Sequence, residues 1–294
     1  MTDFNQYEIV EEDNIWTKLK NSPMSYYIVA INVLVFLAIH ISNFLIADGW
    51  LVSKLMKITY NISIQGEYYR LVTAVFSHYE PMHLFSNCFA ILILGRPVEQ
   101  IFGKWKFLII FLVAGLFGTL TSFIFTEAPA LGASGGVFGI FGVHLYLFLI
   151  NKSKYLSIFG KDMLQLLVIN VVIGFALPNI DYWGHFGGIL GGFLATASLG
   201  LYHQIKINRN LLIGSLLILL IFFGSFITVN QAYVNYVENE ARVISKISAA
   251  LESNNLERFI EARDEYDSIV PLVPPISIAD EKLKQMDAII DASK

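Results

Sequence analysis

Charged residues and cysteine are both scarce in this chain. Only 15% of its 294 residues are charged, whereas 55% are hydrophobic, and the mean hydropathy is +0.58. An average soluble domain is about one quarter charged. The single cysteine, Cys88, can form neither an internal disulfide nor a multi-thiolate metal site. A net charge of −4 provides no basic face for nucleic acid. An ordinary soluble domain and a nucleic-acid-binding protein are therefore excluded.

The N-terminal segment, residues 1–24, lacks the features of a targeting sequence. It is acidic and polar, with no basic cap before an apolar core and no stretch rich in Arg and Ser. We therefore expect the first hydrophobic segment to stay in the mature protein. An acidic start of this kind fits a bacterial cytoplasmic membrane better than an organelle.

Long apolar runs are the feature that the chain does have. A helix of roughly 20 residues crosses the hydrocarbon core of a bilayer. Seven runs predict seven transmembrane helices, approximately at residues 25–47, 81–98, 105–125, 133–150, 163–177, 183–204 and 211–229. The expected fold class is an all-α polytopic membrane protein with a six-helix core at 25–204, an extra seventh helix within 205–230 and a small helical tail at 236–294.

The distribution of Lys and Arg predicts the orientation in the membrane. Nine of these residues fall in the N-terminal segment and in alternate connections, whereas the connections on the opposite side contain only Lys54, Lys57 and Arg70. Because basic residues concentrate on the cytoplasmic side, the N-terminus is expected inside and the tail outside. The second, fourth and sixth spans then all begin at the outer surface.

Two segments outside the spans leave alternatives open. The loop 48–80 has apolar patches, which favours a place in the outer membrane interface over a plainly solvated loop. The tail from residue 238 interleaves charges with apolar residues at helical intervals, so it predicts two or three amphipathic helices broken at Pro271, Pro274 and Pro275. Such a tail is either an appendage that binds an unknown protein partner or a solvated stabilising cap.

A serine surrounded by glycines opens the fourth span, in the sequence Gly132-Ala133-Ser134-Gly135-Gly136. The pattern matches G-x-S-x-G, but the nucleophile elbow needs an α/β sheet that a membrane span does not supply. An α/β-hydrolase is therefore excluded. Taken alone, such a serine is more often a helix cap or a packing site.

A histidine, His185, opens the sixth span within a stripe of glycines at 184, 188 and 192. The fourth span carries a matching stripe, and glycine stripes allow two membrane helices to approach closely. If the two spans pack together, Ser134 and His185 lie at similar depth below the outer surface. A serine within hydrogen-bond reach of a neutral imidazole is an activated nucleophile, so the pair favours catalysis.

A third polar pair, His83 and Asn87, shares one face near the outer end of the second span because the two residues are four apart. Imidazole and amide groups can donate hydrogen bonds to the oxyanion that develops during acyl transfer. An isolated asparagine there would more often form an interhelical hydrogen bond. Three polar clusters on three spans, all on one side, make that alternative weaker.

These motifs together resemble the rhomboid family of intramembrane serine proteases. The matching pieces cover residues 67 to about 204 in family order: Glu67-Tyr68-Tyr69-Arg70, His78, His83-x-x-x-Asn87, Gly95-x-x-x-Glu99-x-x-x-Gly103, Gly132-Ala133-Ser134-Gly135 and His185-x-x-Gly188-x-x-x-Gly192. Tyr69 stands where the family often has Trp. Phe138 stands where an aromatic ring commonly supports the histidine, and it lacks a hydroxyl group.

The resemblance implies a Ser-His dyad with no metal and no cofactor. Ser134 would be the nucleophile and His185 the general base and acid, while His83, Asn87 and the backbone amide of Ser134 would form the oxyanion hole. The implied substrates are membrane-anchored proteins, cut in or near their transmembrane helix in the lipid bilayer. The structural positions of the motif are Arg70, Glu99, Gly132, Gly188 and Gly192.

Three other interpretations compete with a protease that uses a Ser-His dyad. Asp181, four residues before His185, is more simply a capping or solvated carboxylate than a third catalytic residue. A non-proteolytic rhomboid relative, acting as a chaperone or sorting factor for transmembrane helices, remains the alternative, although such proteins usually lack the serine or the histidine. A transporter would be expected to carry charges or broken helices near mid-bilayer, and the polar cluster lies near one surface instead.

Overall fold

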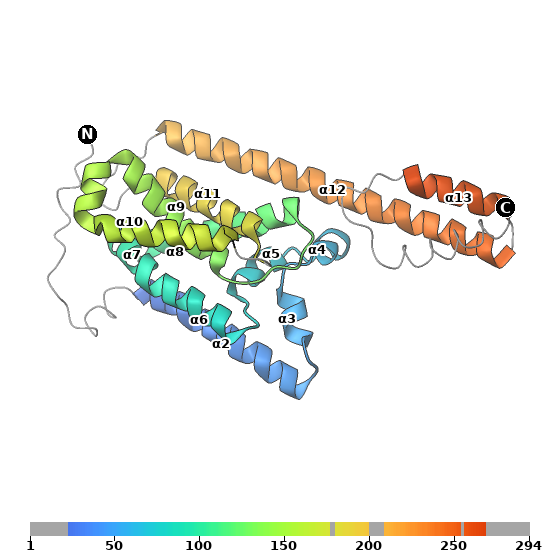
Figure 1. The fold of residues 1–294 in the computed structure, drawn as a ribbon, viewed down its shortest axis with the longest axis horizontal. Helices are drawn as coiled ribbons and strands as arrows, with labels where there is room; N and C mark the ends of the chain where they lie inside the picture. The colour runs from blue at the N-terminus through green and yellow to red at the C-terminus, as the bar shows by residue number, and fades with distance from the viewer. Residues whose placement is uncertain (1–22, 177–179, 200–208, 254–255, 269–294) are drawn as a thin grey trace. The chain divides into compact units, whose positions relative to one another are not determined.

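The computed structural model describes residues 23–176, 180–199, 209–253 and 256–268, and helices dominate them (Figure 1). The single bridge between extended residues in these ranges pairs Lys57 with Ala130. The helices are α2 (Pro23–Leu45), α3 (Trp50–Leu55), α4 (Thr59–Gln65), α5 (Arg70–Thr73), η1 (Ala74–Phe76), α6 (Pro81–Ala90), η2 (Ile91–Gly95), α7 (Arg96–Phe102), α8 (Lys104–Phe125), α9 (Ser134–Ile150), α10 (Lys152–Ala176), α11 (Tyr182–Leu199), α12 (Arg209–Ser253) and α13 (Leu256–Ser268). The chain divides into two compact units, one of residues 1–62 and 66–223 and one of residues 63–65 and 224–294.

Four described helices are long and apolar enough to cross a membrane, and the chain is an all-helical multi-pass membrane protein. They cover Met24–Leu45, Lys104–Phe125, Lys152–Phe175 and Leu217–Ala249. With no water in the bilayer core, a helix is favoured because it satisfies its backbone hydrogen bonds internally. The predicted limits of the first, third and fourth spans agree with α2, α8 and α9 to within two residues.

The second and fifth predicted spans are less regular than the sequence suggests. The second span is α6 and α7 joined by a π-helical turn, Ile91–Gly95. Pro97 follows this turn, and proline cannot supply the amide hydrogen of a regular helix, which disturbs the preceding turn. Gly160, with φ of 74° and ψ of 176°, interrupts α10 and divides it into two helical parts. The part after Gly160 agrees with the predicted fifth span at 163–177, and the part from Lys152 was not predicted.

The centre of the first unit is a close packing of α8, α9 and α11 (Figure 1). The predicted glycine stripes of α9 and α11 do face each other: a Cβ atom on Gly188 would lie well under 3.0 Å from the carbonyl oxygen of Gly135. A Cβ on Gly192 would overlap Gly139 in the same way. Helix α8 joins this contact, since a Cβ on Gly118 would lie 2.8 Å from the carbonyl oxygen of Gly184. Three helices therefore approach almost backbone to backbone.

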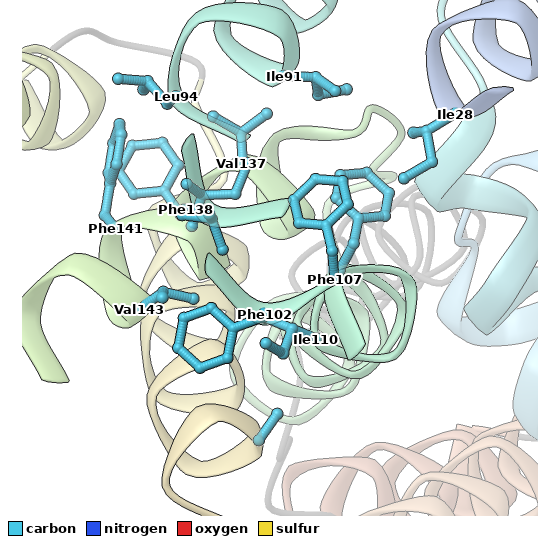
Figure 2. Close-up of a cluster of buried hydrophobic side chains, with 14 of the residues drawn as sticks. Ile28, Ile91, Leu94, Phe102, Phe107, Ile110, Val137, Phe138, Phe141 and Val143 are labelled. Atoms are coloured by element: carbon cyan, nitrogen blue, oxygen red, sulfur yellow. The ribbon is translucent and has the colours of Figure 1, made fainter. Parts of the chain in front are cut away.

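An apolar cluster fills the space between α2, η2, α8 and α9. Figure 2 shows Phe107 and Ile110 of α8, Val137 and Phe138 of α9, and Ile91 of η2 among its members. Phe107, Ile110 and Ile91 are fully buried. This cluster holds the first turn of α9 in place, so Ser134 begins its helix on a packed and rigid support.

Glu99 of α7 caps the N-terminus of α2. Its two carboxylate oxygens accept hydrogen bonds from the backbone amides of Met24 (3.0 Å) and Ser25 (2.9 Å), and one of them also accepts from the Ser25 hydroxyl (2.5 Å). These amides belong to the first helical turn, which has no intrahelical acceptor for them. Glu99 therefore anchors the start of α2 to α7.

Replacing Glu99 by alanine is expected to destabilise the protein by about 1–3 kcal/mol, because it leaves buried amides without acceptors. The measurement is the unfolding midpoint in detergent. Asp162→Ala is the matched control, since Asp162 is exposed on α10. A loss equal to that of the control would contradict the capping function.

The loop between α2 and α6 is folded rather than extended, with α3, α4, α5 and η1 inside it. Arg70 is buried at its centre and forms an ion pair with Glu67 at 2.5 Å. Its guanidinium group also donates to the carbonyl oxygens of Ser53 (2.5 Å) and Met56 (2.9 Å). Hydrogen bonding to Arg70 lowers the pKa of Glu67. Arg70 thus connects Glu67 to the backbone of Ser53 and Met56.

The second unit contains the rest of α12 and helix α13. Val243, Ile247 and Ala262 are buried in it, and Arg242 and Lys246 of α12 both pair with Glu265 of α13. Helix α12 runs unbroken to Ser253, so the expected boundary between the seventh span and the tail falls inside one helix. Two amphipathic helical segments agree with the sequence analysis, whereas the three prolines that were predicted to break the tail lie outside the described residues.

Candidate active site

Ser134 is the first residue of α9, where the helix leaves its leading amides without intrahelical acceptors. In the first backbone hydrogen bond of this turn, the amide of Val137 donates to the carbonyl oxygen of Ala133 at 3.0 Å. The amides of Ser134 and of the next two glycines therefore precede the hydrogen-bond ladder of the helix. They carry the positive end of the helix dipole, which favours a negative charge at this point.

The turn before Ser134 depends on Gly132. Its φ is 128°, a conformation that disfavours any residue with a side chain. Its amide donates to the carbonyl oxygen of Ala74 at 2.9 Å, and a Cβ on it would lie 2.6 Å from Cε1 of His83. Gly132 therefore brings the chain against the imidazole of His83 and directs it into α9.

His185 lies in the first turn of α11 and is almost fully buried. Its Nδ1 lies 3.0 Å from the carbonyl oxygen of Gly174 in α10. Because a carbonyl oxygen only accepts, Nδ1 must carry the proton in this contact, and Nε2 keeps its lone pair. The ring stacks on Phe138 with 3.8 Å between centroids and 11° between planes. The aromatic support expected at position 138 is confirmed.

Among the residues that the structure describes, no hydrogen bond joins the Asp181 carboxylate to the imidazole of His185, and Asp181 acts as a helix cap instead. Its carboxylate accepts from the amide of Gly184 at 2.9 Å, and its carbonyl oxygen accepts from the amide of His185 at 3.1 Å. The carbonyl of Gly174 holds Nδ1 of His185, the position that a triad carboxylate would occupy. The capping interpretation of Asp181 is confirmed.

His83 and Asn87 lie on one face of α6, as their spacing predicts. Asn87 Nδ2 donates to the carbonyl oxygen of His83 (3.0 Å) and lies 3.1 Å from Nε2 of His78. The amide of Ala133 also donates to Nε2 of His78, at 3.3 Å. His78 therefore accepts at Nε2 and connects the face of α6 to the residue before Ser134.

The four predicted residues Ser134, His185, His83 and Asn87 all line one cavity of about 960 Å³. Its walls come from α6, α8, α9, α10, α11 and the segment that leads from α8 to α9. The space is large enough for several residues of an extended peptide. In the part of the chain described, no hydrogen bond joins the Ser134 hydroxyl to His185. Hydrogen bonds of a catalytic pair often tighten only when substrate binds.

Sequence reasoning does not predict the positions of two residues in this region. His78 accepts a hydrogen bond from the amide next to the candidate nucleophile. Lys57, a basic residue of the loop, is fully buried. Periodicity gives no signal for either, because both lie in short connections between helices, and their hydrogen bonds to residues 122–133 are distant in sequence.

Comparison with known proteins agrees with this geometry. The model of the Rhomboid domain matches residues 65–202. The chain is 31% identical over 274 residues to the rhomboid protease GluP of Bacillus subtilis (strain 168), which covers 90% of this chain and 52% of GluP. It is 32% identical over 141 residues to YdcA of the same organism, covering 47% of this chain and 70% of YdcA.

A plant relative matches the same region. RHOMBOID-like protein 7 of Arabidopsis thaliana is 33% identical over 144 residues, covering 48% of this chain and 46% of that protein. The chain thus spans about half the length of GluP and of the plant relative. The matched residues include the whole candidate site, from His83 to His185. With both the domain model and these relatives in agreement, the chain belongs to the rhomboid protease family.

Proposed function

We propose that this protein is an intramembrane serine endopeptidase that cleaves membrane-anchored proteins in or near their transmembrane helix. The observation that carries the proposal is the joint placement of Ser134 and His185 on one cavity, with the imidazole oriented by the carbonyl of Gly174. An imidazole held in this way keeps Nε2 free to accept the proton of a serine hydroxyl.

In the proposed reaction, Ser134 Oγ attacks the carbonyl carbon of the scissile bond while Nε2 of His185 takes the hydroxyl proton. The imidazolium then gives this proton to the leaving amine, and an acyl-enzyme forms. Water, deprotonated by the same nitrogen, attacks the acyl carbon and releases the second product, and the proton returns to Ser134.

The oxyanion of each tetrahedral intermediate is proposed to lie near the amide of Ser134, with His83 and Asn87 beside it. Support comes from the dipole at the start of α9 and from the close approach of His83 to Gly132. Asn87 Nδ2 already bonds to His83 and His78. Asn87 would therefore exchange one of these partners when it binds the oxyanion.

The proposed topology is the six-helix core with one extra transmembrane helix, with the N-terminus in the cytoplasm and the site open to the outer side of a bacterial cytoplasmic membrane. The asymmetry of Lys and Arg between the connections supports this orientation. A substrate helix shields its own carbonyl groups by hydrogen bonding. We therefore expect substrates with a locally weak helix, such as one that contains Gly or Pro.

Substitution of Ser134 by alanine tests the proposal. The wild type, reconstituted in liposomes with a tagged single-span substrate whose helix contains Gly and Pro, is expected to release the cleaved fragment. Ser134→Ala is expected to release none, because no other side chain replaces the hydroxyl. Immunoblotting of the fragment measures the result.

Ser86→Ala is the control, since Ser86 also lines the cavity and its hydroxyl donates to the carbonyl oxygen of His83 in its own helix. Equal cleavage by Ser134→Ala and the wild type would refute the dyad. A wild type that binds the substrate helix without cutting it would favour the non-proteolytic chaperone instead.

A further inference from the structure

Lys57 is a fully buried lysine in a protein with few charges. It lies between α3 and α4, and its exposed fraction is 0%. A buried ammonium group is costly unless its donors are satisfied. Its position therefore calls for a physical explanation that the active-site motifs do not supply.

The ammonium group is enclosed by oxygen atoms from the end of α8 and the segment after it. Nζ of Lys57 donates to the carbonyl oxygens of Thr126 (2.7 Å) and Ala128 (2.8 Å). It lies farther from the carbonyl oxygen (3.4 Å) and hydroxyl (3.2 Å) of Ser122. The end of a helix carries partial negative charge, so a cation is favoured there.

The backbone of Lys57 pairs with the same segment. Its amide donates to the carbonyl oxygen of Ala130 at 2.8 Å, and the amide of Ala130 donates back at 3.1 Å. Three contacts of one lysine thus fix Thr126, Ala128 and Ala130 in succession. Two residues further on, Gly132 directs the chain into α9 and Ser134.

The residues before Lys57 are themselves held firmly. Arg70 donates to the carbonyl oxygen of Met56 at 2.9 Å, and the Thr73 hydroxyl donates to that of Leu55 at 2.8 Å. The segment bound by Lys57 forms one wall of the active-site cavity, because Thr126, Ala128 and Ala130 all line it. A continuous set of contacts therefore leads from Arg70 through Lys57 to the wall beside Ser134.

We propose that Lys57 is a positioning residue for catalysis: its ammonium group fixes the segment from Thr126 to Ala130 and so sets the place of Gly132 and Ser134. The inference rests on the proposed proteolytic function, since it assigns a residue to that same site. Lys57 does not touch the reacting atoms, so it acts through the backbone that it holds. Displacement of a reacting group by about 1 Å lowers turnover by about 100-fold.

The charge on Lys57 gives the proposal a pH signature. Burial lowers the pKa of Lys57 to about 8, and the negative charges of Asp181 and Glu127 oppose this shift. Among the other charged groups of the loop, Arg70 and Glu67 pair with each other, and Asp48, Lys54 and Glu80 are exposed. Above pH 8 Lys57 becomes a neutral amine, which has one donor fewer and directs a lone pair toward carbonyl oxygens. Turnover is therefore expected to fall as the pH rises through 8.

The lowered pKa of Lys57 also predicts that the folded protein does not become less stable as the pH rises above 8. The pKa of Lys57 is lower in the folded protein than its ordinary value of 10.5, so between pH 8 and 10.5 the unfolded chain binds more protons. Stability contributed by this group therefore rises with pH in that window. A fall in turnover without a fall in thermal stability separates positioning from simple unfolding.

The test compares Lys57→Met and Lys57→Arg with the control Lys54→Met, all in the full chain in liposomes. Lys54 is exposed in the last turn of α3, so its replacement leaves the segment untouched. Lys57→Met is expected to lower kcat by about 10- to 100-fold with little change in KM. Lys57→Arg keeps a charge that is not lost below pH 12, so its turnover should not fall near pH 8.

Hydrogen–deuterium exchange in detergent supplies a measurement that is independent of activity. Lys57→Met is expected to raise exchange of the amides of Ala130 and Gly132 by about tenfold relative to Lys54→Met. If the wild type shows no cleavage that depends on Ser134, the proposed function fails and exchange alone decides the inference. Equal exchange in the two methionine variants, or an alkaline fall that persists in Lys57→Arg, would overturn it.

Discussion

His185→Ala is expected to abolish substrate cleavage, with turnover lower by on the order of 10⁴- to 10⁶-fold. In the folded protein Nδ1 of this imidazole donates a hydrogen bond to the carbonyl oxygen of Gly174, and the ring stacks on Phe138. Nε2 is therefore the nitrogen that remains for proton transfer. Without it, the Ser134 hydroxyl has no base, and the leaving amine has no acid. The measurement is initial rate in liposomes, with protein folding checked by thermal melting.

Two variants make this prediction specific. His40→Ala is the matched control, because His40 is exposed on α2 and bonds to the carbonyl of Phe36 in its own helix. It should retain full turnover. The turnover of Phe138→Ala should lie between those of His185→Ala and His40→Ala. This variant leaves the imidazole hydrogen-bonded to Gly174 but removes the stacked ring. If His185→Ala kept activity while Ser134→Ala lost it, another group would have to act as the base.

The residues of the candidate site could be proposed from the sequence because polar residues stand out in apolar spans. Ser134, His185, His83 and Asn87 each lie near the start of an apolar run, and the glycine stripes predicted that the helices of Ser134 and His185 face each other. The structure confirms that all four line one cavity. Helix limits for α2, α8 and α9 were predicted closely, since membrane spans are continuous apolar runs with clear ends.

Features that depend on contacts distant in sequence could not be predicted. The sequence shows Lys57 only as a basic residue of an interfacial loop, and its burial depends on contacts with the distant segment from Thr126 to Ala130. Gly118 of α8 gave no sign that α8 packs with both glycine stripes. The C-terminal end of α12 was also not predicted, because the sequence changes from apolar to charged while the helix continues to Ser253.

Gly188→Ala is expected to lower both stability and turnover, and it tests whether the glycine stripes serve the active site. A Cβ at position 188 would meet the backbone carbonyl of Gly135, the residue directly after Ser134. A backbone carbonyl within a helix cannot rotate away, so α9 and α11 must separate. Overpacking of this kind destabilises by about 1–3 kcal/mol. Because the separation moves Ser134 away from His185, turnover should fall by about 100-fold as well.

Gly214→Ala is the matched control, since Gly214 lies in α12 and a Cβ there would meet nothing within 4 Å. Alanine favours a helix more than glycine does, so this control should be neutral or slightly stabilising. Thermal melting in detergent and cleavage in liposomes are measured for both variants. A Gly188→Ala protein that melts early yet cuts at the wild-type rate would separate helix packing from catalysis. Parallel losses would show that the same few backbone contacts both hold the helices together and keep the nucleophile beside its base.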